Sequence, residues 1–423
     1  MAVIIGFFVL LILGVPIFGI VLMCAAGGVF LYSSTNLMVI VQQIFTGLDS
    51  TTLLAVPFFI VAGSIASKGK TSECLVNCMN VIFGRLPGGP VIATIATCAF
   101  FAAISGSSMA TVVAVGSLMI PALKEQGYPE DMNVGAVCSG GSLGILIPPS
   151  APMVMFCVAM GTSVGEQFMA GFLPGILLAV AWCVYIFIKC SRKKLGSRPK
   201  YTGKEALRVF VKGIPALLFP IIVLGSIYTG WATPTEAAAI SAVYVLLIEK
   251  FIYRTLKFKE MVRFFYEGIV QSATLLLIIG SATALSYFIT TKQIPALAVE
   301  IISGMVSSKA MLIVVLMVML FVAGCFIDTI PLIVILAPIL VPLLNLYDVD
   351  LIHFGIMAVI AAQVGYISPP FGTNLFVTVQ VSGKSFGFVA KSIIPYIAIL
   401  AIVGLAICLI PQISLLLPSM MMK

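Results

Sequence analysis

Two proline pairs interrupt segments that are otherwise apolar enough to form membrane helices. Pro148-Pro149 lies in GILIPPSAP and Pro369-Pro370 lies in GYISPPFGT. Each pair removes two backbone N–H donors, and its first ring excludes the preceding residue from the helical region. In lipid, the freed carbonyls need partners, so such backbone is tolerated only where it meets protein or lines a cavity. Unwound carbonyls beside hydroxyl groups form an oxygen cage that suits a small hard cation.

Polar side chains interrupt two further apolar regions, residues 88–124 and 309–344. The first contains Ser105-Gly106-Ser107-Ser108, and the second contains Asp328-Thr329. Each region is either two full spans or one re-entrant hairpin whose tip stops at mid-membrane. Arms of about 16–19 residues are at the short limit for spanning. The tips are also very small for water-exposed loops, so we favour re-entrant hairpins.

Each expected tip supplies oxygen ligands, and two helix ends meet there, so exposed N–H groups could hold an anion. The alternative is that serine and glycine only allow close helix packing. Because polar tips and proline pairs recur together, we favour ion and substrate binding.

Asp328 is the only acid between Lys309 and Asp348. A carboxylate at that depth is costly and by default marks a functional site. A sodium ligand is favoured over a proton relay, since no second acid or histidine lies nearby in sequence. The alternative is a carboxylate that caps the helix N–H groups at the tip.

The two halves of the chain repeat the same pattern. Adding 221 to a residue number in the first half gives these matches: Ser107 with Asp328, Pro121 with Pro342, Gly144 with Gly365, Pro148-Pro149 with Pro369-Pro370, and Pro174 with Pro395. Several prolines in one register indicate a duplication.

The composition indicates a membrane protein. Of 423 residues, 61% are hydrophobic and 9% charged, whereas soluble domains carry roughly 25% charged residues. The net charge of +8 is no nucleic-acid signal, because the basic residues concentrate between Lys189 and Lys212. With one histidine and no hydrolase or nucleotide-binding motif, an enzyme is not expected. The ten scattered cysteines are interpreted as small buried hydrophobes, not as ligands for a transition metal.

The basic loop at 189–212 marks the cytoplasmic side, with an anionic-lipid or partner site as the alternative. The second copy has no matching basic excess, so we expect it to be inverted, with an unpaired span at 213–230 between the copies. Inverted repeats are typical of secondary transporters. We expect full or broken spans near 2–31, 51–67, 132–162, 168–190, 213–230, 234–253, 268–290, 352–382 and 389–416. Amphipathic helices along the interface are expected near 36–48 and 254–267, and Thr233 with Glu236 predicts a capping box.

The chain resembles the large membrane subunit (DctM type) of tripartite ATP-independent periplasmic (TRAP) transporters in four segments: AISGSSMATVVAVGSLMIPALKEQGY, GGSLGILIPPSAPMV, GCFIDTIPLIVILAPILVPL and VGYISPPFGTNLFV. The resemblance runs from about Leu10 to about Ile410. It implies an all-α polytopic protein with inverted repeats, re-entrant hairpins and Pro-Pro-broken helices that works as an elevator. The implied first half consists of scaffold helices and an arm helix at 1–67, followed by a first transport repeat at 68–190 with hairpin 88–124 and broken helix 132–162. The implied second half begins at 191–267 with the basic loop, scaffold helices and a second arm helix. An inverted transport repeat follows at 268–423, with hairpin 309–344 and broken helix 352–382.

The same resemblance implies the site residues. A first sodium site would use Ser105, Ser107, Gly144, Ile147 and Pro149, and by internal symmetry a second would use Asp328, Thr329, Gly365, Ser368 and Pro370. The copies differ here, because Phe326 stands where the first copy has Ser105. Substrate would contact Ser107, Ser108, Ser150, Asp328, Thr373 and Asn374.

The implied function is sodium-driven uptake of a small organic acid across the bacterial inner membrane. C4-dicarboxylates, sialic acid, other sugar acids and 2-oxo acids all fit an oxygen-rich pocket. A periplasmic binding protein would deliver the substrate, and a separate four-helix membrane subunit would complete the transporter. The alternatives are a stand-alone sodium-coupled anion transporter of related fold, and a scaffold subunit with degenerate sites.

Overall fold

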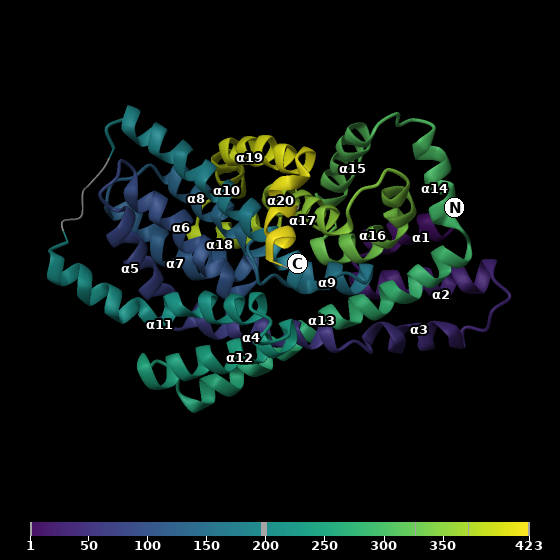
Figure 1. The fold of residues 1–423 in the computed structure, drawn as a ribbon, viewed down its shortest axis with the longest axis horizontal. Coiled ribbons are helices and arrows are strands. Elements are labelled where there is room, and N and C mark those ends of the chain that lie inside the picture. Colours follow the sequence, from purple (N-terminus) through teal and green to yellow (C-terminus); the bar gives the residue numbers. More distant parts are fainter. Residues whose placement is uncertain (1, 196–200, 326, 371, 422–423) are drawn as a thin grey trace.

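A computed structural model describes residues 2–195, 201–325, 327–370 and 372–421. Within these ranges the chain forms helices and turns and contains no β-strand. The molecule is elongated, and its two hairpins lie toward opposite ends, with α6 and α7 at one and α15 and α16 at the other (Figure 1). The long helix α11 runs below the first hairpin, and α13 runs along the lower side toward the second.

The first half contains helices that lead into the first proline break and then a long span. These are α1 (Ala2–Ile12), α2 (Ile17–Tyr32), α3 (Met38–Leu48), the short 3₁₀ turn Thr51–Leu54, α4 (Ala55–Lys68), α5 (Thr71–Phe83), α6 (Gly89–Ser105), α7 (Ser108–Glu125), α8 (Glu130–Ser142), α9 (Ala151–Met160) and α10 (Val164–Arg192). A single helix, α11 (Gly203–Tyr228), joins the halves.

The second half follows the same order. It contains α12 (Pro234–Leu247), a π-helical turn (Ile248–Ile252), α13 (Phe258–Thr291), α14 (Ile294–Ser303), α15 (Lys309–Gly324), α16 (Thr329–Leu346), α17 (Leu351–Ile367), α18 (Thr373–Ser382), α19 (Phe386–Leu409) and α20 (Pro411–Met421). α7 and α16 begin at Ser108 and Thr329, and α8 and α17 begin at Glu130 and Leu351. In each pair, the two helices begin 221 residues apart, which is the repeat offset predicted from the prolines.

The observed helices differ from the expected spans in several places, the first being the expected span at 2–31, which is divided into α1 and α2 before Ile17. The arm helix expected at 254–267 and the span expected at 268–290 form one continuous helix, α13, because no proline separates them. The expected span at 389–416 is divided before Pro411, where α19 ends and α20 begins. The sequence interpretation also missed α5 and α14, two short helices that precede the hairpins.

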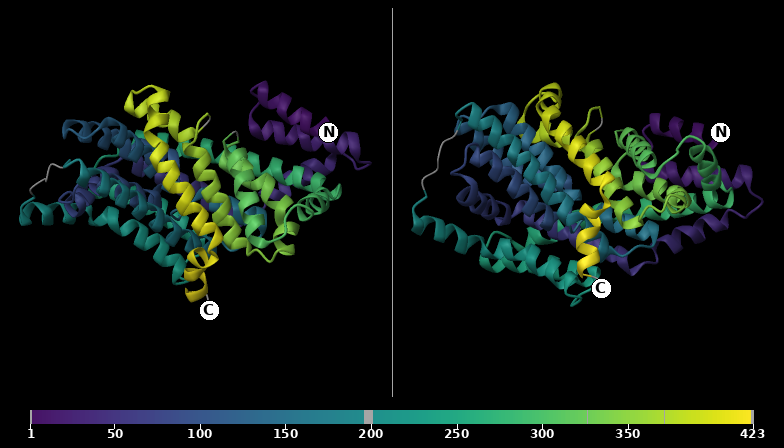
Figure 2. Two further views of the ribbon diagram at one scale, coloured as in Figure 1. Left: turned by 90° about the horizontal axis from the view of Figure 1, so that it is seen from above. Right: turned by 45° about the horizontal axis from the view of Figure 1, so that its top comes forward.

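Six helical segments in the described ranges are long and apolar enough to cross a membrane. They are Thr51–Lys68, Ser108–Glu125, Val164–Arg192, Gly203–Tyr228, Lys259–Thr291 and Phe386–Leu409. The two broken helices are assembled from shorter pieces, and the views in Figure 2 show them within the same bundle. The chain is therefore a multi-pass membrane protein.

Two acidic side chains organise helix ends away from the hairpins. Thr233 and Glu236 form the predicted capping box at the start of α12: the Glu236 backbone N donates to the Thr233 hydroxyl at 3.3 Å, and the Thr233 backbone N donates to the Glu236 carboxylate at 2.8 Å. Glu249, which the sequence interpretation did not single out, is fully buried. Its carboxylate accepts from the backbone N–H groups of Lys70 and Thr71 at 3.1 and 2.8 Å. It thereby connects the turn after α12 to the start of α5.

Candidate functional site

Both proline pairs break a helix where the sequence predicted. α8 continues through a short 3₁₀ turn and ends before Pro148, and α9 starts at Ala151. α17 ends at Ile367, and α18 starts at Thr373. The peptide bond within each proline pair is cis.

The first hairpin tip and the first break interlock through their backbones. Gly106 closes the tip in the left-handed region, with φ of 57°. A β-carbon at Gly106 would lie 2.8 Å from the Pro149 carbonyl oxygen, and one at Gly144 would lie 2.5 Å from that of Ser107. The Ala151 N–H also donates to the Gly106 carbonyl at 3.4 Å. Only glycine allows so close an approach at these two positions.

Hydroxyl groups at the first tip bond to one another and to backbone. The Ser105 hydroxyl lies 3.0 Å from that of Thr111, and the Thr111 hydroxyl donates to the Ser107 carbonyl at 2.7 Å. Within the neighbouring break, the Ser150 hydroxyl donates to the Ile145 carbonyl at 2.6 Å. Ser105, Thr111 and Ser150 are almost completely buried, as are Ile147 and Pro149. The first proposed sodium site is thus a closed cluster of oxygen atoms.

The second hairpin also approaches the second break closely, but at a different position: the contact is with the end of its first arm and not with its tip. A β-carbon at Gly365 would lie 2.4 Å from the Gly324 carbonyl oxygen, which belongs to the last residue of α15. Asp328 caps the next helix: its carboxylate accepts from the Thr329 N–H at 2.7 Å. The capping role that the sequence left as an alternative is therefore present, and it leaves other acceptor positions on the carboxylate for a ligand.

The second half-site is more open than the first. Asp328, Pro369 and Pro370 are exposed, whereas Pro148 and Pro149 are buried. Two hydroxyls beside the second break, those of Ser368 and Thr373, are buried atoms that have no hydrogen-bond partner among the described residues. A buried polar atom without a partner is costly, so these two oxygens are the natural place for a bound ion or water. Phe326, whose position distinguishes the copies in sequence, lies outside the described residues.

Two of the proposed substrate ligands connect the copies. The Ser108 hydroxyl lies 2.8 Å from the side-chain nitrogen of Asn374, and that nitrogen donates to the Cys138 carbonyl at 3.2 Å. Ser108 and Asn374 are almost fully buried, which makes this contact an inter-repeat bridge between α7 and α18. Asp328 forms no hydrogen bond with either residue in the described part of the chain. The proposed substrate residues therefore divide between the two tips.

Two polar residues near the site were missed. Gln363 donates to the Ser142 hydroxyl at 2.9 Å, and these residues occupy equivalent positions in the two copies. The side chain of Tyr366 has polar contacts with Asp328 and Thr329. A signal for Gln363 existed: it is the only amide in an apolar helix, and it matches a serine at the repeat offset.

Salt bridges at one edge of the molecule connect the ends of several helices. Glu130, the first residue of α8, bonds with Lys124 near the end of α7 at 3.2 Å and with Lys384 after α18. These bonds, that to Lys384 foremost, lower the pKa of the Glu130 carboxyl. Asp131 lies 3.5 Å from Lys189 in the last turn of α10. The ends of α7, α18 and α10 thus meet the start of α8.

Two helix hairpins, each packed against a broken helix, define the described part of this chain as a helical membrane protein. A solved structure supports the fold: the chain superposes on the YdaH transporter of Alcanivorax borkumensis with a TM-score of 0.62 and 14% identity, covering 87% of this chain and 86% of that one. The model of the family described as "Tripartite ATP-independent periplasmic transporter, DctM component" matches residues 4–413. The chain belongs to this family.

Curated relatives of the chain have different named substrates. It is 38% identical to the C4-dicarboxylate TRAP transporter large permease protein DctM of Pseudomonas aeruginosa, over 92% of each chain. It is 36% identical to the isethionate TRAP transporter permease protein DctMQ of Oleidesulfovibrio alaskensis, over 97% of this chain and 65% of that one. It is 32% identical to the 2,3-diketo-L-gulonate TRAP transporter large permease protein YiaN of Escherichia coli, over 96% of this chain and 95% of that one. The chain is a large permease subunit for organic acids, and its family is not enzymatic.

Proposed function

We propose that this chain is the large subunit of a sodium-coupled importer of a small organic acid in the bacterial inner membrane. The observation that carries the proposal is the pair of hairpin tips, each held against a broken helix and each surrounded by oxygen atoms. Ser105, Ser107 and Thr111 would hold one sodium ion with the carbonyls near Gly144 and Ile147. Asp328 and the unpartnered hydroxyls of Ser368 and Thr373 would hold the other. Bound sodium would supply positive charge for an acid substrate between the tips.

The helix ends support an inverted arrangement of the two copies. α8 starts beside the end of α10, where the basic loop follows, and the positive-inside rule places that edge in the cytoplasm. α19 starts near the same edge, just after Lys384, and its 24 residues are about 36 Å long. Its far end contacts the start of α17, because His353 lies 2.9 Å from the Cys408 carbonyl oxygen. α8 and α17 would therefore enter from opposite sides.

This arrangement suits an elevator mechanism. The hairpins would be re-entrant, one open to each side of the membrane, and would move with the broken helices as one transport body. α11, α12 and α13 would form the static scaffold, together with a small membrane subunit. Family members work with such a subunit and with a substrate-binding protein. One relative is named as a single permease protein, DctMQ.

The test is uptake by the full chain in liposomes with its small membrane subunit. A C4-dicarboxylate is offered with its binding protein under an inward sodium gradient. We expect uptake only with both the gradient and the binding protein. Sodium-independent uptake would contradict the coupling, and uptake without the binding protein would support the stand-alone alternative.

A further inference from the structure

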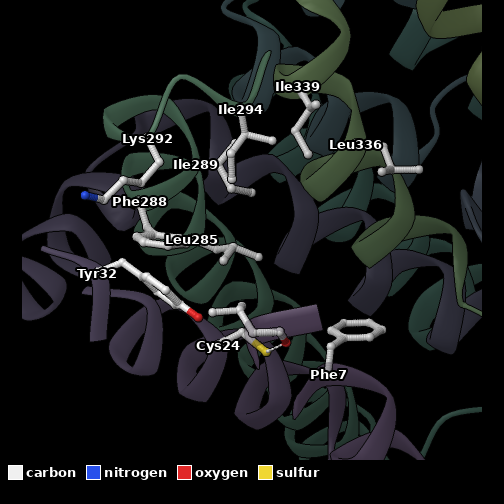
Figure 3. A pocket seen from close by; sticks show the side chains of 11 residues that line it. Phe7, Cys24, Tyr32, Leu285, Phe288, Ile289, Lys292, Ile294, Leu336 and Ile339 are labelled. Carbon is white, nitrogen blue, oxygen red and sulfur yellow. Dashed lines mark hydrogen bonds between the residues drawn. The ribbon is translucent and has the colours of Figure 1, made fainter. Parts of the chain in front are cut away.

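An apolar cavity of about 640 Å³ lies between the N-terminal helices and the second hairpin (Figure 3). Its walls come from α1 and α2 on one side, from the ends of α13 and α14, and from α16 through Leu336 and Ile339. Apart from Tyr32 and Lys292, the residues lining it are apolar. Its volume falls within the roughly 300–1,000 Å³ that ligand pockets occupy.

The two polar residues lie together at one side of the cavity. Tyr32 is the last residue of α2, and Lys292 follows the last residue of α13. Figure 3 shows both on the same side, with Phe7 and Leu336 at the other; the Lys292 nitrogen points outward, and the Tyr32 hydroxyl points toward Cys24. Lys292 is exposed and forms no ion pair with any described residue. The cavity therefore has an apolar interior and one unneutralised cation at its mouth.

This distribution matches an amphipathic anion better than water or a protein helix. An apolar cavity does not hold ordered water, since water needs several polar partners. A partner helix would have to bring its own acidic group to Lys292, whereas a phospholipid carries its phosphate beside its acyl chains. A flexible acyl chain fits such a space, and lysine at the end of a membrane helix lies at the level of lipid headgroups.

We propose that the cavity binds one anionic phospholipid, with acyl chain carbons among Phe7, Leu285 and Leu336 and with its phosphate at Lys292. A headgroup without a cation of its own gains most from the lysine, because a zwitterionic headgroup already carries an ammonium beside its phosphate. The lipid is therefore of the phosphatidylglycerol type.

The site has a consequence for transport because its walls belong to different parts of the fold. α13 and α2 pack against each other along their length, whereas α16 is an arm of the second hairpin. A lipid that contacts both would favour the position of the hairpin seen here. Removing it would change the rate of transport without removing a sodium or substrate ligand.

The test measures lipid retention by native mass spectrometry on the full chain, purified with and without the small membrane subunit. Phosphatidylglycerol is the probe, and phosphatidylethanolamine is the competitor. We expect Lys292→Gln to weaken phosphatidylglycerol retention about five-fold, the effect of one lysine on an anionic lipid. The matched control Lys204→Gln, at an exposed cytoplasmic lysine, should leave retention unchanged.

A second variant tests the apolar part of the site. Ile294→Trp fills the cavity and should abolish retention, whereas Ile402→Trp, on a surface that is 71% exposed, should not. Unchanged retention in both Lys292→Gln and Ile294→Trp would overturn the proposal, as would equal retention of phosphatidylethanolamine. A photo-crosslinker at Ile339 should capture lipid; capture of the small membrane subunit instead would assign the cavity to a protein contact.

Discussion

In each half-site a glycine of the broken helix lies close to the backbone of its hairpin, at the tip in the first and in the arm in the second, and the surroundings also differ. In both, a β-carbon on that glycine would have no room. At the first, the hydroxyls bond to one another and the proline pair is buried. At the second, the proline pair and Asp328 are exposed, and two hydroxyls have no partner among the residues that the structure describes.

The two copies therefore share a close approach of a glycine in the broken helix to the hairpin backbone, but they differ in the polar groups around it. The first half-site is already satisfied, so an ion there must replace existing hydrogen bonds. The second has a carboxylate and unpartnered oxygens, so an ion there gains contacts that the protein alone lacks. We therefore expect the second half-site to dominate the sodium dependence of transport.

The largest effect is expected from Asp328→Asn. Asparagine caps helices as well as aspartate does, so the hairpin should remain folded while the charge is lost. Because contacts to charged groups are worth about 1.5–3 kcal/mol, sodium-dependent uptake should fall at least about tenfold. Asp348→Asn, a change at an exposed aspartate with φ of 52° that asparagine tolerates, is the matched control. Full uptake by Asp328→Asn would leave Asp328 with only its capping role.

Glycine substitutions should damage both half-sites through packing. Gly144→Ala and Gly365→Ala each force a β-carbon into a backbone oxygen, and overpacking costs about 1–3 kcal/mol. The thermal midpoint in detergent should fall more for Gly144→Ala, because the enclosed first half-site has less room to relax. Gly225→Ala, with nothing within 4 Å of its β-carbon, is the control and should be neutral or stabilising. Equal stability of all three variants would contradict the interlock.

Serine substitutions should affect different measurements in the two half-sites: the free energy of unfolding at the first and the sodium dependence of uptake at the second. Ser105→Ala removes a satisfied hydroxyl and should lower the free energy of unfolding by about 1 kcal/mol. Ser368→Ala removes an unpartnered hydroxyl, so stability should hold while the sodium concentration for half-maximal uptake rises about two- to ten-fold. The reverse pattern would show that the first half-site controls the sodium dependence.

The smallest effect is expected at the bridge between the copies. Ser108→Ala and Asn374→Ala should each destabilise the protein, and a double-mutant cycle should give a coupling of about 0.5–1.5 kcal/mol. The cycle is measured as unfolding in detergent. If the coupling is zero and uptake is lost in both variants, the pair acts on substrate and not as a bridge.

Local chemistry made much of the fold predictable. Proline pairs end helices, so both breaks were found at their positions, and the polar tips between two apolar runs located both hairpins. The capping box at Thr233 and Glu236 was predictable for the same reason, since its partners are three residues apart. The buried carboxylate of Glu249 was not, because its partners Lys70 and Thr71 lie far away in the sequence.

The sequence alone determined that this is a duplicated, multi-pass membrane protein with two broken helices. The length of an apolar run and the loss of backbone N–H donors at proline are local properties that can be read directly from the sequence. Only the tertiary structure decided which hydroxyls form hydrogen bonds: that of Ser105 lies beside Thr111, whereas that of Ser368 has no partner in the described ranges. It also decided the cavity at Lys292, whose walls come from residues 3 to 339. Such features depend on packing between distant segments, which composition and spacing do not encode.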